Sequence, residues 1–278
     1  MSHLSSTHLS STHPPPNVLT IAGSDSGGGA GIQADLKTFS ALGAYGASVV
    51  TALTAQNTLG VGAIHVPPAD FIAAQLDAVF SDLRIDAVKV GMLANVGIVR
   101  AVAAALRRYR PATVILDTVM LSKSGHALLA ADAVQALREE LLPLATLITP
   151  NLPEAAVLLD EAEAHDEESM VRQAQALRAR GAHAVLIKGG HLGGGHSPDW
   201  LVEAGGNARL GAARVATQAT HGTGCTLSAA IAALRPQRPD LPSAVNEAKA
   251  YLTQALLRAE HLRVGRGIGP VHHFHRWW

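Results

Sequence analysis

Hydrophobic residues recur along the chain in two alternating patterns: short apolar runs, and longer stretches with an apolar residue at every third or fourth position. The first apolar run and the helical stretch that follows it illustrate both patterns. Residues 18–22 form an apolar run that ends at Gly23, and residues 32–42 carry apolar side chains at helical spacing. The segment between them is rich in glycine. The pattern predicts a strand, a glycine loop and a helix in that order.

The same succession continues toward the C-terminus. We expect further strands over residues 47–55, 61–66, 86–92, 113–117, 146–150 and 184–190, and edge strands over 198–203 and 209–215. We expect the other helices over residues 68–83, 95–109, 131–142, 167–180, 226–234 and 242–262, with one more that begins at Pro153. This alternation predicts an α/β fold, with a doubly wound, mostly parallel central sheet and helices on both faces.

Residues 18–278 are interpreted as one domain, because neither an internal repeat nor a low-complexity linker interrupts residues 18–270. Residues 1–17 are interpreted as a disordered tail, rich in Ser, Thr and His and containing three consecutive prolines. The tail lacks the apolar region of a secretory signal.

The composition argues against nucleic-acid-binding and membrane proteins. Basic and acidic residues balance at 22 each, so no net field attracts nucleic acid or an anionic membrane. Aromatic residues make up 4%, too few for base-stacking platforms, and no apolar run is long enough to cross a bilayer. The one cysteine fits a reducing compartment, so we expect a cytoplasmic protein.

The glycine loop over residues 23–31 matches neither Gly-x-Gly-x-x-Gly nor the Walker A pattern. Its position after a strand nevertheless favours a ligand site without a dinucleotide signature. Asp35, one turn into the following helix, can accept a hydrogen bond from a ligand amine or can be an ordinary solvated carboxylate.

Two polar or polarisable residues stand at the ends of the next strands. Gln56 follows residues 47–55 and offers a donor and an acceptor together, which suits a pyrimidine-like ring; ordinary turn chemistry is the alternative. Met92 ends residues 86–92, where its thioether can lie against a ring or simply fill the core.

Charged residues stand at the later strand ends. Asp117 is a candidate for a Mg²⁺ shell. Asn151 and Glu154 have the spacing of a helix cap, and can also position water around Mg²⁺ and phosphate. Lys188 lies near the end of residues 184–190. In a doubly wound sheet these ends share one crevice, which favours a phosphate site.

The segment Gly222-Thr223-Gly224-Cys225 runs directly into an Ala- and Leu-rich helix. The bare amides and the dipole of a helix N-terminus suit a phosphate, and the same field favours the thiolate of Cys225. A glycine-containing helix start with an inert cysteine is the alternative, and a lone Gly-x-Gly favours it. The convergence of the other strand ends shifts the balance toward a phosphate site.

With these motifs placed, the chain resembles the bacterial hydroxymethylpyrimidine/phosphomethylpyrimidine kinases of thiamin biosynthesis, within the ribokinase-like superfamily. The cysteine after Gly-Thr-Gly is informative, because sugar kinases of that superfamily usually carry aspartate there. The resemblance rests on residues 22–37, 51–57, 89–92, 116–120, 149–154, 188–191, 221–225 and 269–275.

The resemblance implies a role for each candidate residue. Gly23, Asp35, Gln56 and Met92 would hold the aminopyrimidine, with Asp35 and Gln56 reading its polar edge. Asp117, Asn151, Glu154 and Lys188 would surround the phosphates and Mg²⁺, with Asp117 and Glu154 holding the metal largely through water. Gly222, Thr223, Gly224 and Cys225 would cradle the transferred phosphoryl group, beside Lys188, and Cys225 would take the proton of the substrate alcohol.

The implied activity is ATP-dependent phosphorylation of 4-amino-5-hydroxymethyl-2-methylpyrimidine to its monophosphate, and of the monophosphate to the diphosphate. The resemblance also suggests a homodimer. Two alternatives stay open: a pyridoxal or pyridoxine kinase of the same fold, and a non-catalytic aminopyrimidine sensor. A metal site at His272, His273 and His275 is the weakest reading, because no cysteine or carboxylate partners lie at ligand spacing.

Overall fold

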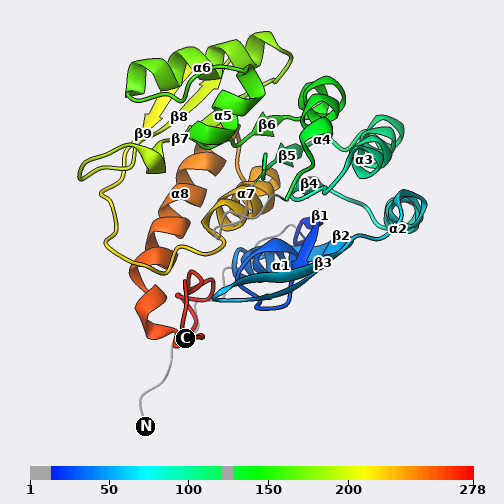
Figure 1. Cartoon of the computed structure of the whole chain (residues 1–278), viewed down its shortest axis with the longest axis horizontal. Helices are drawn as coiled ribbons and strands as arrows, with labels where there is room; N and C mark the ends of the chain where they lie inside the picture. The colour runs from blue at the N-terminus through cyan, green and yellow to red at the C-terminus, as the bar shows by residue number, and fades with distance from the viewer. Residues whose placement is uncertain (1–13, 121–127) are drawn as a thin grey trace.

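One mixed sheet of nine strands runs through the computed structural model, which describes residues 14–120 and 128–278 (Figure 1). The strand order is β3-β2-β1-β4-β5-β6-β7-β8-β9. Strands β2 to β7 in this order run parallel, whereas β3, β8 and β9 join antiparallel. The strands are β1 (Asn17–Asp25), β2 (Tyr45–Asn57), β3 (Gly60–His65), β4 (Ala87–Val90), β5 (Val114–Leu116), β6 (Leu147–Ile148), β7 (Val185–Lys188), β8 (Asp199–Glu203) and β9 (Gly206–Leu210).

Helices cover both faces of the sheet (Figure 1). One buried cluster joins α1, α7 and α8, and a second joins α2 to α6. Neighbouring residues of β1 divide between them: Val18 belongs to the first cluster and Leu19 to the second, as side chains alternate along a strand. The helices are α1 (Gly31–Ala41), α2 (Ala69–Asp82), α3 (Val96–Tyr109), α4 (Ala131–Ala136), α5 (Leu152–Leu159), α6 (Glu167–Ala179), α7 (Thr223–Leu234) and α8 (Leu241–Leu257).

The doubly wound, mostly parallel sheet predicted from the sequence is confirmed, with three boundary corrections. β1 begins at Asn17, which was assigned to the tail; residues 1–13 of that tail lie outside the described residues. The last edge strand ends at Leu210 instead of residue 215, because its pairing with β8 ends there. The helix expected to continue to residue 142 leaves α-geometry after Ala136 and ends in a short 3₁₀ turn that contains Pro143.

The sheet has a topological switch point at β1, which lies between β2 and β4. Because β1, β2, β4, β5, β6 and β7 are parallel, their carboxyl ends meet at one edge of the sheet. Ligands of open α/β sheets bind outside this edge, near the switch point. The topology therefore directs the search for a site to the loops that follow these strands.

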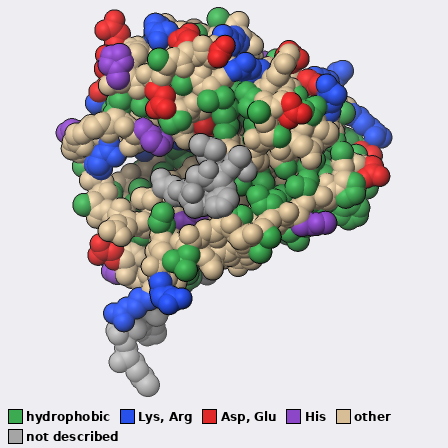
Figure 2. All heavy atoms as spheres, in the orientation of Figure 1, with side chains coloured by type: hydrophobic (Ala, Val, Ile, Leu, Met, Phe, Trp, Pro, Cys, Tyr) green, Lys and Arg blue, Asp and Glu red, His purple; other side chains and the backbone are tan. Residues whose placement is uncertain are grey.

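Basic and acidic side chains lie interspersed on the face seen in Figure 2, in keeping with the balanced charge of the whole chain. Within residues 14–120 and 128–278, the helices are all too short or too polar to traverse a lipid bilayer.

A buried ion pair joins β4 to α1 behind the carboxyl edge. Lys89 Nζ lies 2.8 Å from Asp35 Oδ2, and both side chains have 0% exposure. The hydroxyl of Thr20 donates to the same oxygen at 2.6 Å. Burial raises the pKa of Asp35 despite Lys89, whereas Asp35 and other nearby acidic groups raise the pKa of Lys89 against the effect of burial. Each charge is tolerated inside the protein because the other accompanies it.

Replacing Lys89 by Met should lower the free energy of unfolding by about 3–5 kcal/mol, because the substitution leaves a buried carboxylate without its cation. Urea unfolding followed by circular dichroism measures this change. The control is Arg108→Met, which breaks an exposed ion pair with Asp77 and should cost much less. Equal losses in the two variants would show that burial of the pair is not what makes Lys89 important.

Candidate active site

A cavity of about 920 Å³ opens at the carboxyl edge of the sheet. Its wall follows the spatial order of the strands, from Gln56 on β2 through the residues after β4 to Lys188 on β7. Neighbouring strands lie about 4.8 Å apart, so the β4 and β7 positions are separated by roughly 14 Å. The sequence-predicted residues that line the cavity are Gly23, Gln56, Met92, Asp117, Asn151, Glu154, Lys188, Gly222, Thr223, Gly224 and Cys225.

The centre of the cavity carries one ammonium group between two carboxylates. Lys188 Nζ lies 3.4 Å from Asp117 Oδ1 and 3.9 Å from Glu154 Oε2. Asp117 is buried, and the hydroxyls of Thr149 and Ser228 each donate to it at 3.2 Å. The strand ends thus bring together acidic and basic groups that lie up to 71 residues apart in the chain.

Burial shapes the charges of this centre. It raises the pKa of Glu154, and Asp117 adds to the rise while Lys188 opposes it. Burial alone would lower the pKa of Lys188, but the neighbouring Asp117 and Glu154 raise it, which keeps the ammonium charged. A cationic lysine beside two carboxylates suits a site for phosphate and a divalent cation.

The acidic pair fits Mg²⁺ by the chemistry of its donors, because Mg²⁺ prefers carboxylate oxygens and keeps several of its waters. In the described part of the chain, no group of three or more His, Cys, Asp or Glu side chains has the geometry of a complete metal cage. Asp117 and Glu154 therefore suit a cation that a second molecule also coordinates.

Asn151 and Glu154 begin α5 as a capping box. The side chain of Asn151 accepts from the N–H of Glu154 at 2.8 Å, and the Glu154 carboxylate accepts from the N–H of Asn151 at 2.9 Å. The hydroxyl of Thr118 donates to the same carboxylate oxygen at 3.1 Å. The helix cap expected from the sequence is confirmed, and both residues also line the cavity.

The N-terminus of α7 faces the charged centre. A Cβ placed on Gly224 would lie 3.6 Å from Lys188 Nζ and 3.6 Å from Asp117 Oδ2. The N–H of Thr223 reaches the carbonyl of Thr220 at 3.4 Å, whereas those of Gly224 and Cys225 have no acceptor among the described residues. Two amides at the positive end of the helix dipole therefore remain open to an anion.

Cys225 lines the cavity, but its electrostatic environment differs from the sequence-based expectation. Burial raises the pKa of the thiol to about 11, and the nearby Asp35 and Asp117 add to this rise. Lys89 and the N–H of Gly31 act in the opposite direction without reversing it. The helix N-terminus was expected to favour the thiolate of Cys225; instead the pKa of the thiol is raised, because burial, with two carboxylates nearby, outweighs the helix field.

Asp35 is the other correction. It was expected to read the polar edge of a ligand, but its carboxylate has no exposure and does not line the cavity. Its Oδ2 accepts from Lys89 and Thr20, and its Oδ1 has no partner among the described residues. Lys89 lines the cavity in its place, so the effect of Asp35 on the site passes through Lys89.

The end of the cavity near the switch point is suited to a flat ring. A Cβ on Gly23 would lie 3.0 Å from the sulfur of Met92, so glycine there leaves room for the thioether. The carbonyl of Met92 accepts from the hydroxyl of Thr51 at 2.5 Å, which holds this turn against β2. Gln56, partly exposed on β2, supplies the polar group of this end.

Comparisons with known proteins identify the family. Residues 25–272 match the sequence profile described as phosphomethylpyrimidine kinase. The hydroxymethylpyrimidine/phosphomethylpyrimidine kinase of Salmonella typhimurium is 62% identical over 262 residues, which cover 94% of this chain and 98% of that protein. This chain belongs to the phosphomethylpyrimidine kinase family.

Solved structures agree with this membership. The phosphomethylpyrimidine kinase of Clostridium difficile has a TM-score of 0.78 at 43% identity, covering 87% of this chain and 99% of its own. An ADP complex of Bacillus subtilis pyridoxal kinase has a TM-score of 0.86 at 36% identity, covering 93% and 97%. The scaffold is thus similar to that of kinases that act on two kinds of aromatic ring.

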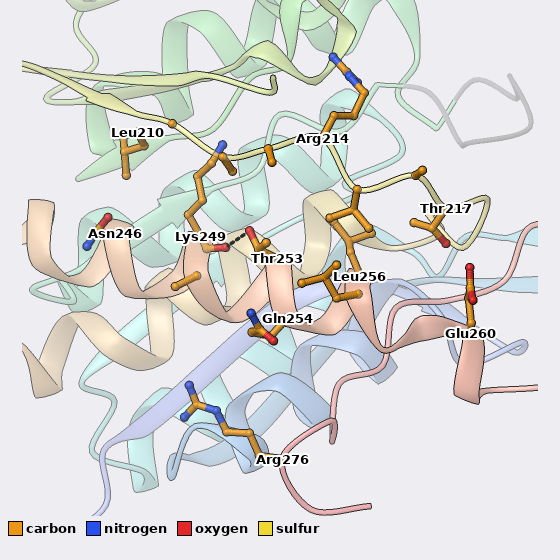
Figure 3. A pocket seen from close by; sticks show the side chains of 17 residues that line it. Leu210, Arg214, Thr217, Asn246, Lys249, Thr253, Gln254, Leu256, Glu260 and Arg276 are labelled. Carbon is orange, nitrogen blue, oxygen red and sulfur yellow. Dashed lines mark hydrogen bonds between the residues drawn. The ribbon is translucent and has the colours of Figure 1, made fainter. Parts of the chain in front are cut away.

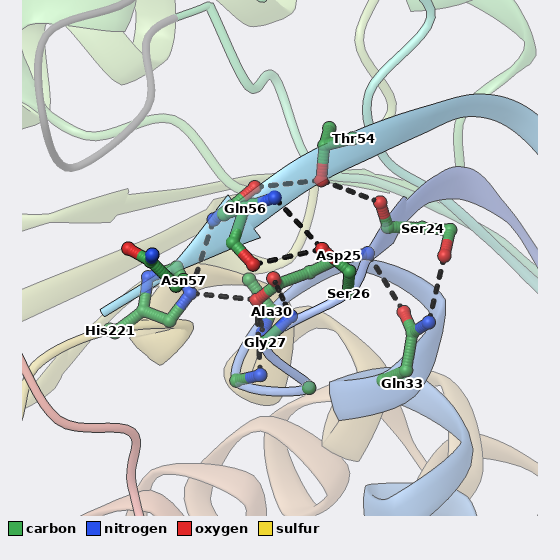
Figure 4. A network of polar contacts seen from close by, with 12 residues as sticks. Ser24, Asp25, Ser26, Gly27, Ala30, Gln33, Thr54, Gln56, Asn57 and His221 are labelled. Carbon is green, nitrogen blue, oxygen red and sulfur yellow. Dashed lines mark hydrogen bonds and ion pairs between the residues drawn. The ribbon is translucent and has the colours of Figure 1, made fainter. Parts of the chain in front are cut away.

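In this member of the phosphomethylpyrimidine kinase family, the sequence reasoning missed a polar network beside Gln56 (Figure 4). His221 Nε2 lies 2.8 Å from Asp25 Oδ2 and 3.3 Å from Gln56 Nε2. Both Asp25 and His221 line the cavity. The available signal was their place inside two of the segments that carry the family resemblance, residues 22–37 and 221–225.

The sequence reasoning also missed the wall formed by residues 210–217 and α8. A second cavity of about 640 Å³ lies between them, and several of its lining residues also border the main cavity (Figure 3). Arg214 donates to the carbonyls of Gly190 and Gly194, so it holds the neighbouring loop in place. Residues 209–215 were predicted as an edge strand. Their apolar side chains are as typical of a strand as of a cavity wall, so the sequence did not indicate the cavity.

Gly222 should tolerate no side chain, because its φ is +77° and an added Cβ would lie 1.9 Å from the carbonyl oxygen of Gly29. Gly222→Ala is expected to lower kcat/KM by roughly 100-fold or more, since the amides of α7 would shift away from the phosphoryl group. Steady-state kinetics and thermal unfolding measure the two effects.

The matched control is Gly43→Ala. Gly43 has a φ of +75° with no atom within 4 Å of an added Cβ. It should lose about 1–2 kcal/mol of stability from the left-handed backbone alone, with kcat/KM unchanged. Similar kinetic losses in both variants would contradict a specific role for the contact with Gly29.

Proposed function

We propose that this chain transfers a phosphoryl group from ATP to 4-amino-5-hydroxymethyl-2-methylpyrimidine, and then phosphorylates the monophosphate to the diphosphate, as steps of thiamin biosynthesis. The observation that carries the proposal is the arrangement of one cavity in which a ring-sized end, a charged centre and the open amides of α7 adjoin. The Salmonella typhimurium relative, a hydroxymethylpyrimidine/phosphomethylpyrimidine kinase at 62% identity, supports the same activity.

The pyrimidine binds at the switch-point end. Gln56 pairs with the polar edge of the ring, and the thioether of Met92 lies against its face. The absent side chain of Gly23 leaves the space for that contact. In this position the hydroxymethyl group points along the sheet edge toward Cys225 and the N-terminus of α7.

The phosphates of ATP occupy the charged centre. Lys188 supplies the positive charge, and the open N–H groups of Gly224 and Cys225 donate hydrogen bonds to the phosphoryl oxygens. Asp117 and Glu154 would hold Mg²⁺, mostly through water, with Asn151 beside them; the bound metal would neutralise phosphate charge. Alignment and charge neutralisation are the main demands of phosphoryl transfer, and these groups meet both.

The nucleoside end of ATP lies along residues 211–217 and α8. Val215, Leu252 and Leu256 give this part of the cavity an apolar wall. The wall adjoins Lys188 through the loop that follows β7, so a triphosphate can reach the charged centre from there. This assignment puts ATP and the pyrimidine at opposite ends of one cavity.

Cys225 serves the first phosphorylation as the proton acceptor of the substrate alcohol. Only the thiolate can accept this proton; because burial raises the pKa of the thiol to about 11, Cys225 first loses its own proton to solvent, and the thiolate then takes the alcohol proton as the alcohol oxygen attacks the phosphoryl group. The second phosphorylation has a different need, because its nucleophile is a phosphate oxygen that is already anionic near neutral pH.

A pyridoxal kinase activity is the second candidate, supported by the likeness to the Bacillus subtilis pyridoxal kinase. The higher identity to the pyrimidine kinases favours the aminopyrimidine as the main substrate. The binding-module alternative has less support, because Glu154, Lys188 and Cys225 line the same cavity as Gln56 and a sensor would need none of the three.

We further propose a cytoplasmic homodimer. Among residues 14–120 and 128–278, no strand pairs with the outer side of the edge strand β3, and Leu53, Leu59 and Ile64 are exposed on the β2–β3 hairpin at 48%, 63% and 38%. A second copy placed on this hairpin would cover them. Sedimentation velocity of wild type and Leu59→Glu tests the arrangement, and a wild-type monomer would exclude it.

The direct test of the activity couples ADP release to the aminopyrimidine alcohol and identifies the products by mass. We expect the monophosphate first and the diphosphate later, with pyridoxal turned over more slowly at equal concentration. Lys188→Met should abolish ADP release while leaving pyrimidine binding measurable by calorimetry. Binding of the pyrimidine without ATP consumption by the wild type would refute the kinase assignment.

Cys225→Ala should separate the two phosphorylations. We expect kcat for the alcohol to fall by about 10²–10⁴, the usual contribution of a general base, and kcat for the monophosphate to fall by less than about tenfold. Steady-state assays with each purified substrate give the comparison. Equal losses on both substrates would assign Cys225 a structural role in place of proton transfer.

A further inference from the structure

Asp25 and His221 form a pair beside the ring-binding end of the cavity. Asp25 ends β1, and His221 immediately precedes Gly222, the N-cap residue of α7. Their side chains are 3% and 15% exposed, and the contact between them measures 2.8 Å. The pair therefore lies between the two glycine loops, at the point where Gln56 reaches into the cavity (Figure 4).

The hydrogen bonds that the Asp25 carboxylate accepts determine which of the two side chains carries the proton between them. Its carboxylate accepts the N–H groups of Gly27, Gly29 and Ala30 at 2.8–3.0 Å. Burial would raise the pKa of Asp25, but His221 and these amides together lower it below its ordinary value. An ionised carboxylate has no proton to give, so the proton between the two side chains belongs to Nε2 of His221.

This proton decides which end of the Gln56 amide can face His221. With an N–H on His221, the Nε2 of Gln56 at 3.3 Å would set one donor against another. The Thr54 hydroxyl lies 2.9 Å from the carbonyl of Ser24 and 3.0 Å from Gln56 Oε1. Because it has one proton, it can donate fully to only one of these two acceptors.

An amide rotated by 180° occupies nearly the same space and satisfies every group. Gln56 Oε1 then shares the one Nε2–H of His221 with Asp25 Oδ2, Gln56 Nε2 donates to the Thr54 hydroxyl, and that hydroxyl donates to Ser24. Each end of the amide keeps one further site, a lone pair on oxygen and an N–H on nitrogen. These two sites lie together on one edge of the amide.

We infer that Asp25 and His221 are positioning residues that fix the orientation of the Gln56 amide and so make the cavity select an aminopyrimidine over its 4-oxo counterpart. The inference rests on the proposed function, because Gln56 must contact the ring. The aminopyrimidine edge offers an amine donor beside a ring-nitrogen acceptor. The 4-oxo ring offers a carbonyl acceptor beside an N–H donor, the reverse pattern, which a fixed amide cannot match.

The test measures kcat/KM for 4-amino-5-hydroxymethyl-2-methylpyrimidine and for its 4-oxo analogue in wild type, His221→Leu and His221→Gln. In wild type the amino substrate should be strongly preferred, because the wrong edge leaves buried polar groups unpaired. His221→Leu frees the amide and should reduce the preference roughly 10-fold to 100-fold. His221→Gln keeps an N–H donor toward Asp25 and should restore most of the preference.

Two further variants separate orientation from folding. Thr54→Val removes the other anchor of the amide and should reduce the preference in the same direction, even if His221→Leu does not fold. His273→Gln is the matched control, because His273 is a buried histidine that contacts Thr226 of α7 and does not line the main cavity. It should leave the ratio of the two kcat/KM values unchanged, whatever its effect on thermal stability.

The outcomes distinguish this inference from the proposed function. Calorimetric titration of the two pyrimidines, without ATP, provides a second ratio that does not depend on catalysis. If wild type binds and phosphorylates the aminopyrimidine but the ratio stays the same in His221→Leu and Thr54→Val, the positioning role is overturned alone. If wild type neither binds nor phosphorylates either ring, the proposed function and this inference fail together.

Discussion

The close approach of two glycine loops is the contact on which the site depends. A Cβ on Gly222 would lie 1.9 Å from the carbonyl oxygen of Gly29, and one on Gly29 would lie 2.4 Å from the ring of His221. The loops therefore pack backbone against backbone, which side chains would prevent. Because of this contact, the N-terminus of α7 opens onto the same cavity as the carboxyl end of β1, and a helix dipole adjoins a ring-binding surface.

The charged centre is assembled before any phosphate arrives. Lys188 is held between Asp117 and Glu154, and hydroxyl groups from the chain donate to both carboxylates. Such preorganised groups need little rearrangement when charge develops during phosphoryl transfer. Burial, together with the nearby carboxylates of Asp35 and Asp117, raises the pKa of the Cys225 thiol. In the proposed function, the buried environment that binds the nucleotide also disfavours the thiolate form of Cys225.

The likeness to a pyridoxal kinase and to pyrimidine kinases indicates a shared scaffold, and the proposed function puts the choice of ring at one end of the cavity. In this chain that end is built from Gln56 and Met92, with Asp25 and His221 behind the glutamine. Polar groups that are pinned by a network can discriminate between rings of equal size, whereas apolar contact alone discriminates weakly. In the proposed function, specificity and phosphoryl transfer are linked because His221 directly precedes Gly222.

The amino-acid sequence alone was enough to predict the order of strands and helices and the parallel sheet, because these follow from local periodicity. It also placed Asp117 and Lys188 at strand ends and Cys225 at a helix start, because these positions lie in motifs a few residues long. Its predictions failed where long-range burial decides the outcome. The tertiary structure placed Asp35 behind the cavity against Lys89, raised the pKa of Cys225 and joined Asp25 to His221, which lie 196 residues apart. Desolvation and pairing depend on neighbours that only the folded chain brings together, so no local pattern encodes them.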